Sequence, residues 1–326
     1  MDRGEFTARI LTDKRSSFVT LIASREPIAM QIAAHVLAYN VTRTLRAVLE
    51  NISPHVQKIY IAHPLRPWGY VEHSRSTKVN PTARDDILEA TKGLNVEVIQ
   101  GDWETEEETR NACLKRAKED GFDWLLTQDA DEFYTEHSWG LILKHLKKSF
   151  HEDHFVTTWY NFWKSCQYVV VGPNGEIKGT NAGFAVRCRK DASFKRSRIT
   201  SFDRPSVLDY PCFHYGYVRT DAEIQEKVST WAHANEFDAL RWYRVKWANW
   251  SENTKNLHPT APWIWKRAIR FPGEQPDFSM NFNLDFQNTP AVGISLLEDL
   301  AFDAAVSVRH CARSIKQSIK RLIVSK

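Results

Sequence analysis

Residues 124–133 read WLLTQDADEF, and this segment indicates an α/β fold. Its first half is an apolar run with the length and composition of a buried strand. Its second half places Asp129, Asp131 and Glu132 directly after that strand. In open α/β sheets, ligands bind outside the carboxyl ends of the strands. These acids therefore lie where a binding site is expected, although a bare D-x-D pattern also arises in acidic loops.

The residues before this stretch alternate between apolar runs and helical patterns. Short apolar runs at 32–39, 58–62 and 96–99 predict strands. The helix that precedes the acidic stretch starts with a capping-box pattern, because Thr105 is followed three residues later by Glu108. Strands joined by helices in this way are typical of a mostly parallel sheet with helices on its faces.

The residues after about 154 have a different pattern. Residues 154–164 alternate aromatic and polar side chains, as in a half-buried strand, and GPNG at 172–175 predicts the turn of a hairpin. Residues 221–257 and 294–326 are rich in helix formers. We expect an α/β fold that is followed by an aromatic-rich, mostly helical C-terminal part.

Charge and cysteine usage exclude several classes of protein. The formal net charge is +4, and the basic residues form no cluster or motif that would predict nucleic-acid binding. The five cysteines are scattered singly without C-x-x-C spacing, which argues against a zinc site and favours reduced thiols. No uncharged apolar stretch approaches the roughly 18 residues of a membrane span. We therefore expect a cytoplasmic protein.

The last residues combine an apolar stripe with basic side chains. Ile315, Ile319 and Ile323 share one face of a predicted helix. Such a helix either packs on the protein with its lysines in solvent, or attaches peripherally to the anionic inner face of a membrane. The basic residues of this segment are Arg313, Lys316, Lys320, Arg321 and Lys326.

Four segments resemble, in the same order, segments of family 2-like glycosyltransferases with the GT-A fold. The first is HVLAYN at 35–40, which is similar to their first strand, and the second is TRN at 109–111 on the helix before the acids. The third is the D-x-D-E-F run itself, and the fourth is FHYGYVR at 213–219, with Lys227 eight residues later. The resemblance covers about residues 30–230.

This resemblance implies a domain organisation and a cofactor. A GT-A-like nucleotide-sugar-binding and catalytic domain would span residues 1–220, and a helical extension over 221–326 would pack on it. A divalent ion, Mn²⁺ or Mg²⁺, would be held by the carboxylates of Asp129 and Asp131. His214 is either a third ligand to that ion or a hydrogen-bonded core histidine.

The same resemblance implies a nucleotide diphosphate sugar as the donor. Tyr39 and Asn40 would lie beside the nucleotide, unless the tyrosine belongs to the core. Arg110 would either contact the diphosphate or hold the acidic loop through a bidentate bond. Arg219 and Lys227 would clamp phosphates or be surface charges on the helix that begins near residue 221. The other residues expected at the donor are Asn111 and Asp129.

The resemblance also implies an inverting transfer, which needs a base within hydrogen-bond reach of the acceptor hydroxyl. Asp203 and Asp209 flank a proline in a loop-like segment and are candidates. Glu132 would either orient a water or an acceptor hydroxyl, or face solvent. The chain lacks the Q-x-x-R-W motif of better-known members. The acceptor is therefore expected only as a class, a glycan or a lipid-linked sugar.

Two other classes of protein fit parts of the pattern. A metal-dependent nucleotidyltransferase or phosphohydrolase could use the same acids, but residues 35–42 lack the glycine-rich first loop of sugar nucleotidyltransferases. A non-catalytic carbohydrate-binding protein is supported only by the aromatic content. We therefore expect a metal-dependent glycosyltransferase.

Overall fold

The computed structural model describes residues 30–177, 179–202, 204–231, 233–260, 262–277, 294 and 296–324. Gln31–Lys326 form one compact unit. The boundary that we predict at residue 220 falls inside this unit and stays a prediction. No helix among the described residues is both long and apolar enough to cross a membrane.

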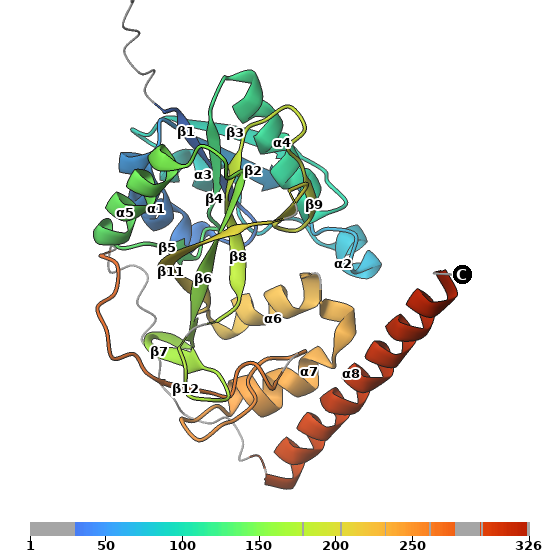
Figure 1. The fold of residues 1–326 in the computed structure, drawn as a ribbon. Helices are drawn as coiled ribbons and strands as arrows, with labels where there is room; N and C mark the ends of the chain where they lie inside the picture. Colours follow the sequence, from blue (N-terminus) through green and yellow to red (C-terminus); the bar gives the residue numbers. More distant parts are fainter. Residues whose placement is uncertain are drawn as a thin grey trace, which may run out of the picture. The chain divides into compact units, whose positions relative to one another are not determined.

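A ten-stranded sheet forms the centre of the described part of the chain (Figure 1). Its strands are β1 (Ile32–Leu37), β2 (Lys58–Pro64), β3 (Val96–Gly101), β4 (Trp124–Thr127), β5 (Glu132–Phe133), β6 (His154–Trp163), β7 (Ser165–Val171), β8 (Asn181–Arg187), β11 (Ser206–Tyr217) and β12 (Arg267–Arg270). The order is β12-β7-β6-β8-β4-β1-β2-β3, and β11 pairs with β5 and β6. β9 (Phe194–Arg196) and β10 (Ile199–Thr200) form a separate pair.

Besides β11, which pairs parallel to β6, the strands β3-β2-β1-β4 are parallel to one another. Helical crossovers join these strands in sequence, as parallel neighbours require. The expected α/β class, with a central sheet flanked by helices, is confirmed. The helices are α1 (Thr42–Ile52), η1 (Ser53–His55), α2 (Glu72–Thr77), α3 (Arg84–Ala90), α4 (Glu106–Glu119), α5 (Glu136–Lys148), α6 (Asp221–Thr230), η2 (Ala234–Glu236), α7 (Ala239–Trp242), η3 (Tyr243–Ala248) and α8 (Leu296–Val324).

Helix α4 covers one face of the parallel strands. Its buried residues Cys113 and Ala117 belong to the same core cluster as Ala33 and Leu37 of β1. Side chains alternate between the two faces of a strand, so His35 points to this face as well. The polar end of α4 and the end of β1 therefore meet on the same side of the sheet.

Two expectations for the antiparallel strands are wrong. β6 is buried along most of its length because its aromatic residues belong to two cores: Phe155 contacts Trp124, and Trp163 joins a C-terminal cluster. The hairpin turns at Lys164, whose φ is 65°, and joins β6 to β7. The turn at 172–175 leads instead to β8, which pairs with β6 and not with β7.

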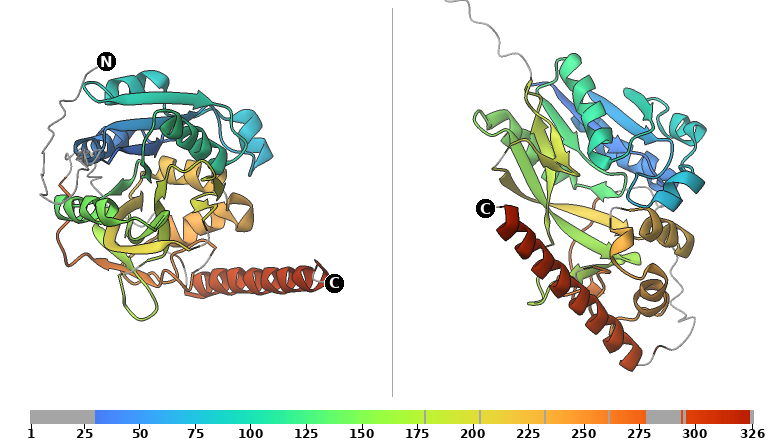
Figure 2. Two further views of the ribbon diagram at one scale, coloured as in Figure 1. Left: turned by 45° about the horizontal axis from the view of Figure 1, so that its top comes forward. Right: turned by 90° about the vertical axis from the view of Figure 1, so that its right-hand side faces the viewer.

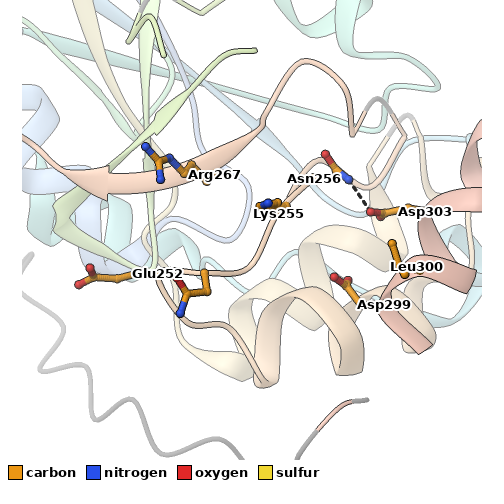
Figure 3. Close-up of a pocket in the computed structure, with 8 residues that line it drawn as sticks. Glu252, Lys255, Asn256, Arg267, Asp299, Leu300 and Asp303 are labelled. Atoms are coloured by element: carbon orange, nitrogen blue, oxygen red, sulfur yellow. Dashed lines mark hydrogen bonds between the residues drawn. The ribbon is translucent and has the colours of Figure 1, made fainter. Parts of the chain in front are cut away.

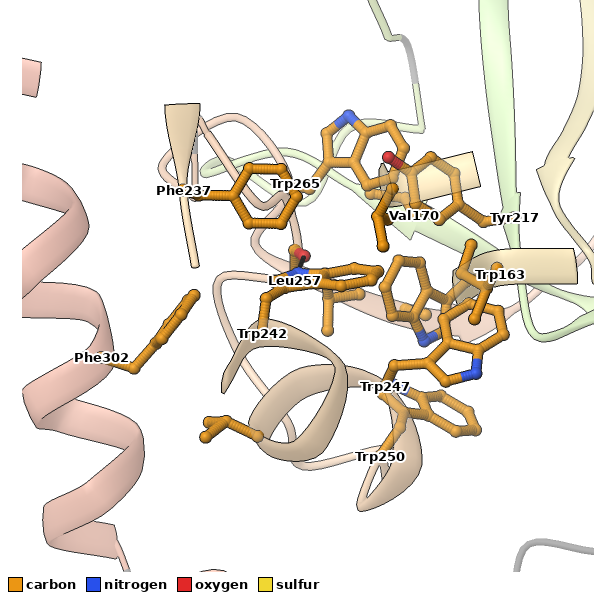
Figure 4. Packing of buried hydrophobic residues seen from close by; sticks show 14 of the residues in the cluster. Trp163, Val170, Tyr217, Phe237, Trp242, Trp247, Trp250, Leu257, Trp265 and Phe302 are labelled. Atoms are coloured by element: carbon orange, nitrogen blue, oxygen red, sulfur yellow. Dashed lines mark hydrogen bonds between the residues drawn. The ribbon is translucent and has the colours of Figure 1, made fainter. Parts of the chain in front are cut away.

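The C-terminal part is built around tryptophan (Figure 4). The ring of Trp163 on β6 lies edge-on to Trp247 of η3, with 5.1 Å between ring centroids, and to Trp265 at 6.2 Å. Edge-to-face pairs of this kind add to the free energy that aromatic burial contributes. These rings are core residues that fix the helical C-terminal part to the sheet.

Helix α8 is one long helix (Figure 2). An apolar contact and a charged contact hold it to the tryptophan core. Phe302 is buried in the tryptophan cluster. The buried ammonium of Lys246 contacts Asp299 and lies 2.8 Å from Asp303. The expected terminal helix is confirmed. The structure does not describe the basic side chains of this helix from Arg313 onward, so membrane attachment stays a prediction.

Candidate active site

Two strand pairings assemble the acidic site. Where β4 ends, the N–H of Gln128 donates to the carbonyl oxygen of His35 at 3.1 Å, so the acidic residues leave the sheet beside β1. β5 then pairs with β11, and the N–H of Tyr215 donates to the carbonyl oxygen of Asp131 at 2.7 Å. These pairings bring His214, which is distant in the sequence, next to Asp131.

Asp129 is held by two arginines. Arg110, fully buried on α4, reaches both carboxylate oxygens, with Nη1 3.2 Å from Oδ1 and Nη2 3.3 Å from Oδ2. Nη2 of Arg198 lies 2.8 Å from Oδ2. Burial opposes the ionisation of Asp129, but the two guanidinium groups hold its pKa well below the usual range. In this structure Arg110 holds the acidic loop, one of the two roles that the sequence leaves open.

Arg198 is a site residue that the sequence does not reveal. It lies in the turn between β9 and β10, at the end of the basic run KRSR (195–198), which reads as a solvated loop. The structure buries it, and its Nη2 bonds Glu132 at 2.5 Å as well as Asp129. Glu132 is fully buried, and burial together with the neighbouring aspartates raises its pKa to about 8. No local pattern marks Arg198, because its partners are distant in sequence.

His214 presents an unprotonated nitrogen to Asp131. Its Nε2 lies 3.7 Å from Oδ1 of Asp131, and its Nδ1 lies 2.7 Å from Oδ1 of Asn161. An amide oxygen only accepts hydrogen bonds, so the ring proton resides on Nδ1 and Nε2 keeps its lone pair. Burial lowers the pKa of His214 to about 4, so the ring is neutral at pH 7. An imidazole oriented in this way by a polar neighbour is typical of a metal ligand.

Two cations complete the surroundings of Asp131. Nη2 of Arg219 donates to Oδ2 of the carboxylate at 2.8 Å. A Cβ built on Gly216 would lie 2.5 Å from Nε2 of His214 and 3.3 Å from Nζ of Lys227. Burial lowers the pKa of Lys227 to about 8, with a further contribution from Arg219. Gly216 therefore leaves the space in which an imidazole and an ammonium lie near the same carboxylate.

The end of β1 joins the site through Arg219. Nη1 of this arginine donates to the carbonyl oxygen of Asn40 at 3.1 Å, and Asn40 itself has a φ of 54°. The hydroxyl of Tyr39 donates to Glu226 of α6 at 3.1 Å, and its ring contacts Trp68 with 5.5 Å between centroids. Both residues therefore lie where the acidic loop, β1 and α6 come together.

Two of the expected residues are placed differently, and a third is not described. The side chain of Asn111 bonds both the N–H and the carbonyl oxygen of Phe194, so it holds β9 in place. Asp209 is exposed on β11, and no hydrogen bond of the described residues joins it to the acidic site. Asp203 lies outside the described residues. The identity of the base stays a prediction.

The facing atoms of Asp131 and His214 have the spacing of two ligands to one divalent ion. Two ligands that each lie about 2.1 Å from one ion are roughly 3 to 4 Å apart, and the atoms of Asp131 and His214 that face each other are 3.7 Å apart. Within the described ranges, no group of three or more His, Cys, Asp or Glu side chains could hold a metal ion. An ion here would complete its shell with water or phosphate oxygens, as magnesium sites commonly do.

Two cavities lie in the second half of the fold. The larger, about 360 Å³, lies between the segment 252–256, Arg267 and α8, where Asn256 donates to Asp303 (Figure 3). The smaller, about 230 Å³, is lined in part by Asn161, the residue that orients His214. Of the two, only the smaller cavity shares a residue with the acidic site.

We expect the protein to lose stability as the pH falls from about 7 to 4. Burial lowers the pKa of His35 to about 3 and that of His154 to about 4, whereas histidines of the unfolded chain titrate near about 6.5. Between these values the unfolded state binds more protons. Each buried histidine therefore lowers the free energy of unfolding by up to about 1.4 kcal/mol per pH unit.

Urea unfolding at several pH values across this range measures the slope. Replacing His154 by glutamine should reduce the slope of the free energy of unfolding against pH by up to about 1.4 kcal/mol per pH unit. Replacing the exposed His73 by glutamine should leave this slope unchanged. Equal slopes in the His154→Gln variant and the unmodified protein would contradict the assignment.

No family model and no curated protein matches this chain. Among solved structures, it is similar to TarS 1–349 from S. aureus, with 12% identity over 68% of this chain and 71% of that chain and a TM-score of 0.37. It is similar to a 4-diphosphocytidyl-2C-methyl-D-erythritol synthase from Anaerococcus prevotii, with 13% identity, 60% and 93% coverage and a TM-score of 0.34. It is also similar to glucosyl-3-phosphoglycerate synthase from Mycobacterium tuberculosis in complex with Mn²⁺ and UDP, with 12% identity, 41% and 44% coverage and a TM-score of 0.29. At these scores, the function has to be argued from the site.

Proposed function

We propose that this chain is a metal-dependent glycosyltransferase that moves a sugar, with inversion, from a nucleotide diphosphate sugar to a glycan or lipid-linked acceptor. The observation that carries the proposal is the pair formed by Asp131 and His214. A carboxylate oxygen and an unprotonated imidazole nitrogen face each other at 3.7 Å at the carboxyl end of the parallel strands. This is the sheet edge at which open α/β folds bind their ligands.

Asp131 and His214 would hold the ion, Mn²⁺ or Mg²⁺. When bound, the ion would supply Lewis-acid stabilisation of the departing diphosphate. Asp129, whose carboxylate is occupied by Arg110 and Arg198, would act by fixing the loop that carries Asp131. Asparagine 161 would keep the imidazole in the tautomer that leaves Nε2 unprotonated.

Lys227 and Arg219 would contact the diphosphate. The ammonium of Lys227 has no hydrogen-bond acceptor among the described residues and lies over the ring of Tyr217 at 5.2 Å. A partly buried ammonium without an acceptor is unfavourable, and a phosphate oxygen would satisfy it. Arg219 already donates a hydrogen bond to Asp131. Its remaining N–H groups would bind the diphosphate of the nucleotide sugar while it holds this carboxylate.

For the base, we retain Asp203 and Asp209 ahead of Glu132. Glu132 is buried and bonded to Arg198 at 2.5 Å, and this contact engages one of its oxygens in the interior. A base must instead reach an acceptor hydroxyl on the face opposite the leaving diphosphate. The proposed role of Glu132 is therefore to hold Arg198 beneath the acidic loop.

The proposal is tested with purified protein, a panel of nucleotide diphosphate sugars, and Mn²⁺. We expect release of the nucleoside diphosphate from at least one donor. Thorough chelation should reduce the rate about a hundredfold or more, because the charge on the diphosphate is then no longer offset by the ion, and added Mn²⁺ should restore it. Full turnover after chelation would refute metal dependence. Release of a nucleoside monophosphate together with a sugar phosphate would instead support a phosphohydrolase. Formation of a nucleoside triphosphate and a sugar phosphate on addition of pyrophosphate would support a nucleotidyltransferase.

A further inference from the structure

A cavity of about 230 Å³ opens beside the β6–β7 hairpin. Its walls come from β6, the turn after β7 and the segment before β12, which are far apart in the sequence. Its volume is below the roughly 300 Å³ at which pockets for drug-sized ligands begin, so it suits a single small ring. The lining includes Asn161, Glu176, Gly179, Thr180, Trp263 and Trp265.

The lining combines indole rings with neutral or acidic hydrogen-bonding groups. Trp263 is 39% exposed. Trp265, two residues later, is buried and lies edge-on to Tyr217, with 4.9 Å between ring centroids. Large aromatic faces bind the apolar face of a sugar ring, while a hydroxyl, an amide and a carboxylate pair with sugar hydroxyls. The described lining residues include no lysine or arginine. The carboxylate of Glu176 in this lining would repel a phosphate, so the described residues favour a neutral sugar as the ligand.

Asn161 connects this cavity to the acidic site. Its Oδ1 accepts from Nδ1 of His214 at 2.7 Å. Its Nδ2 lies toward Gly179 in the cavity wall, where a Cβ on that glycine would be 2.7 Å away. No acceptor for this amide nitrogen is found in the part of the chain that the structure describes. One side chain thus orients the histidine beside Asp131 and offers donors to a ligand in the cavity.

We propose that this cavity is the subsite for a neutral sugar ring of the acceptor. The inference rests on the proposed function, because only a glycosyltransferase has an acceptor to place beside the His214–Asp131 pair. The indole of Trp263 would stack on the ring, and the amide of Asn161 and the carboxylate of Glu176 would bind its hydroxyls.

The test is saturation-transfer NMR with the methyl glycosides of glucose, galactose, mannose and N-acetylglucosamine, on the full chain without nucleotide or metal. At least one glycoside should bind. Trp263→Ala should weaken its affinity roughly three- to tenfold, the loss expected for one aromatic contact. Phe150→Ala, which removes another exposed aromatic ring, should leave the affinity unchanged. The failure of all four glycosides to bind, or equal affinity in the two variants, would overturn the proposal.

Two further measurements keep the result interpretable. Trp263→Phe retains a ring and should keep most of the affinity. If Trp263→Ala does not fold, Glu176→Gln replaces it: loss of the carboxylate should weaken the affinity, and an unchanged affinity would contradict the proposal. Binding of UDP with Mn²⁺ is measured separately on the unmodified protein. Nucleotide and metal binding without glycoside binding would refute the subsite alone. Glycoside binding without nucleotide and metal binding would refute the proposed transferase and leave a sugar-binding cavity.

Discussion

Replacement of Asp131 by asparagine should reduce kcat/KM for sugar transfer by about a thousandfold or more. Asparagine keeps the shape of the side chain but removes the charge that faces Nε2 of His214 and binds Arg219. The site would then lose one of the two ligands that we propose for the ion. Arg219 and Lys227 would also lose their nearest common counter-charge. Steady-state kinetics, together with Mn²⁺ affinity from calorimetry, measures both effects.

Two other aspartate-to-asparagine variants serve as controls for this experiment. Asp191→Asn changes an exposed aspartate outside the site and should leave both quantities unchanged. Asp129→Asn should affect Mn²⁺ affinity less than Asp131→Asn, because the carboxylate of Asp129 is bound to Arg110 and Arg198. Undiminished Mn²⁺ affinity in the Asp131→Asn variant would disprove the assignment of this carboxylate as a ligand.

Replacement of Arg198 by alanine should lower the free energy of unfolding by about 3–5 kcal/mol, the usual effect of removing one partner from a buried ion pair. The guanidinium bonds Asp129 at 2.8 Å and Glu132 at 2.5 Å, and both it and Glu132 are buried. Without this guanidinium, Asp129 and Glu132 would remain beside each other, and only Arg110 would offset their negative charge. Urea unfolding measures the loss of stability, and the transfer assay should show a parallel loss of activity.

The control for this change lies in the same hairpin. Arg196→Ala removes an exposed arginine and should change the stability by no more than about 0.5 kcal/mol. A double-mutant cycle with Glu132→Gln isolates the pair: the two changes should be non-additive by at least about 1 kcal/mol, because the residues share a buried contact. Additive changes in the free energy of unfolding would show that the stabilising effect of Arg198 does not depend on Glu132.

The early strands and the helix before the acids follow from local signals. Each apolar run in the first half of the chain is long enough to specify a strand, and the cap at Thr105 marks the start of α4, where the N–H of Glu108 donates to its hydroxyl at 3.4 Å. The position of Asp129 and Asp131 at a strand end also follows from sequence order. The turn residues at 172–175 predict a turn correctly but not the strands that it connects, because a local pattern does not specify which strands pair.

The fold class and the acidic pair at the edge of the sheet therefore follow from local sequence patterns. The surroundings of that pair depend on how distant segments pack together. The β5–β11 pairing brings His214 to Asp131, the β9–β10 turn brings Arg198 to Asp129, and β6 supplies Asn161. The physical reason is that these contacts join residues 50 to 90 positions apart. Their geometry arises from strand pairing and burial across the whole sheet, which no short stretch of sequence encodes.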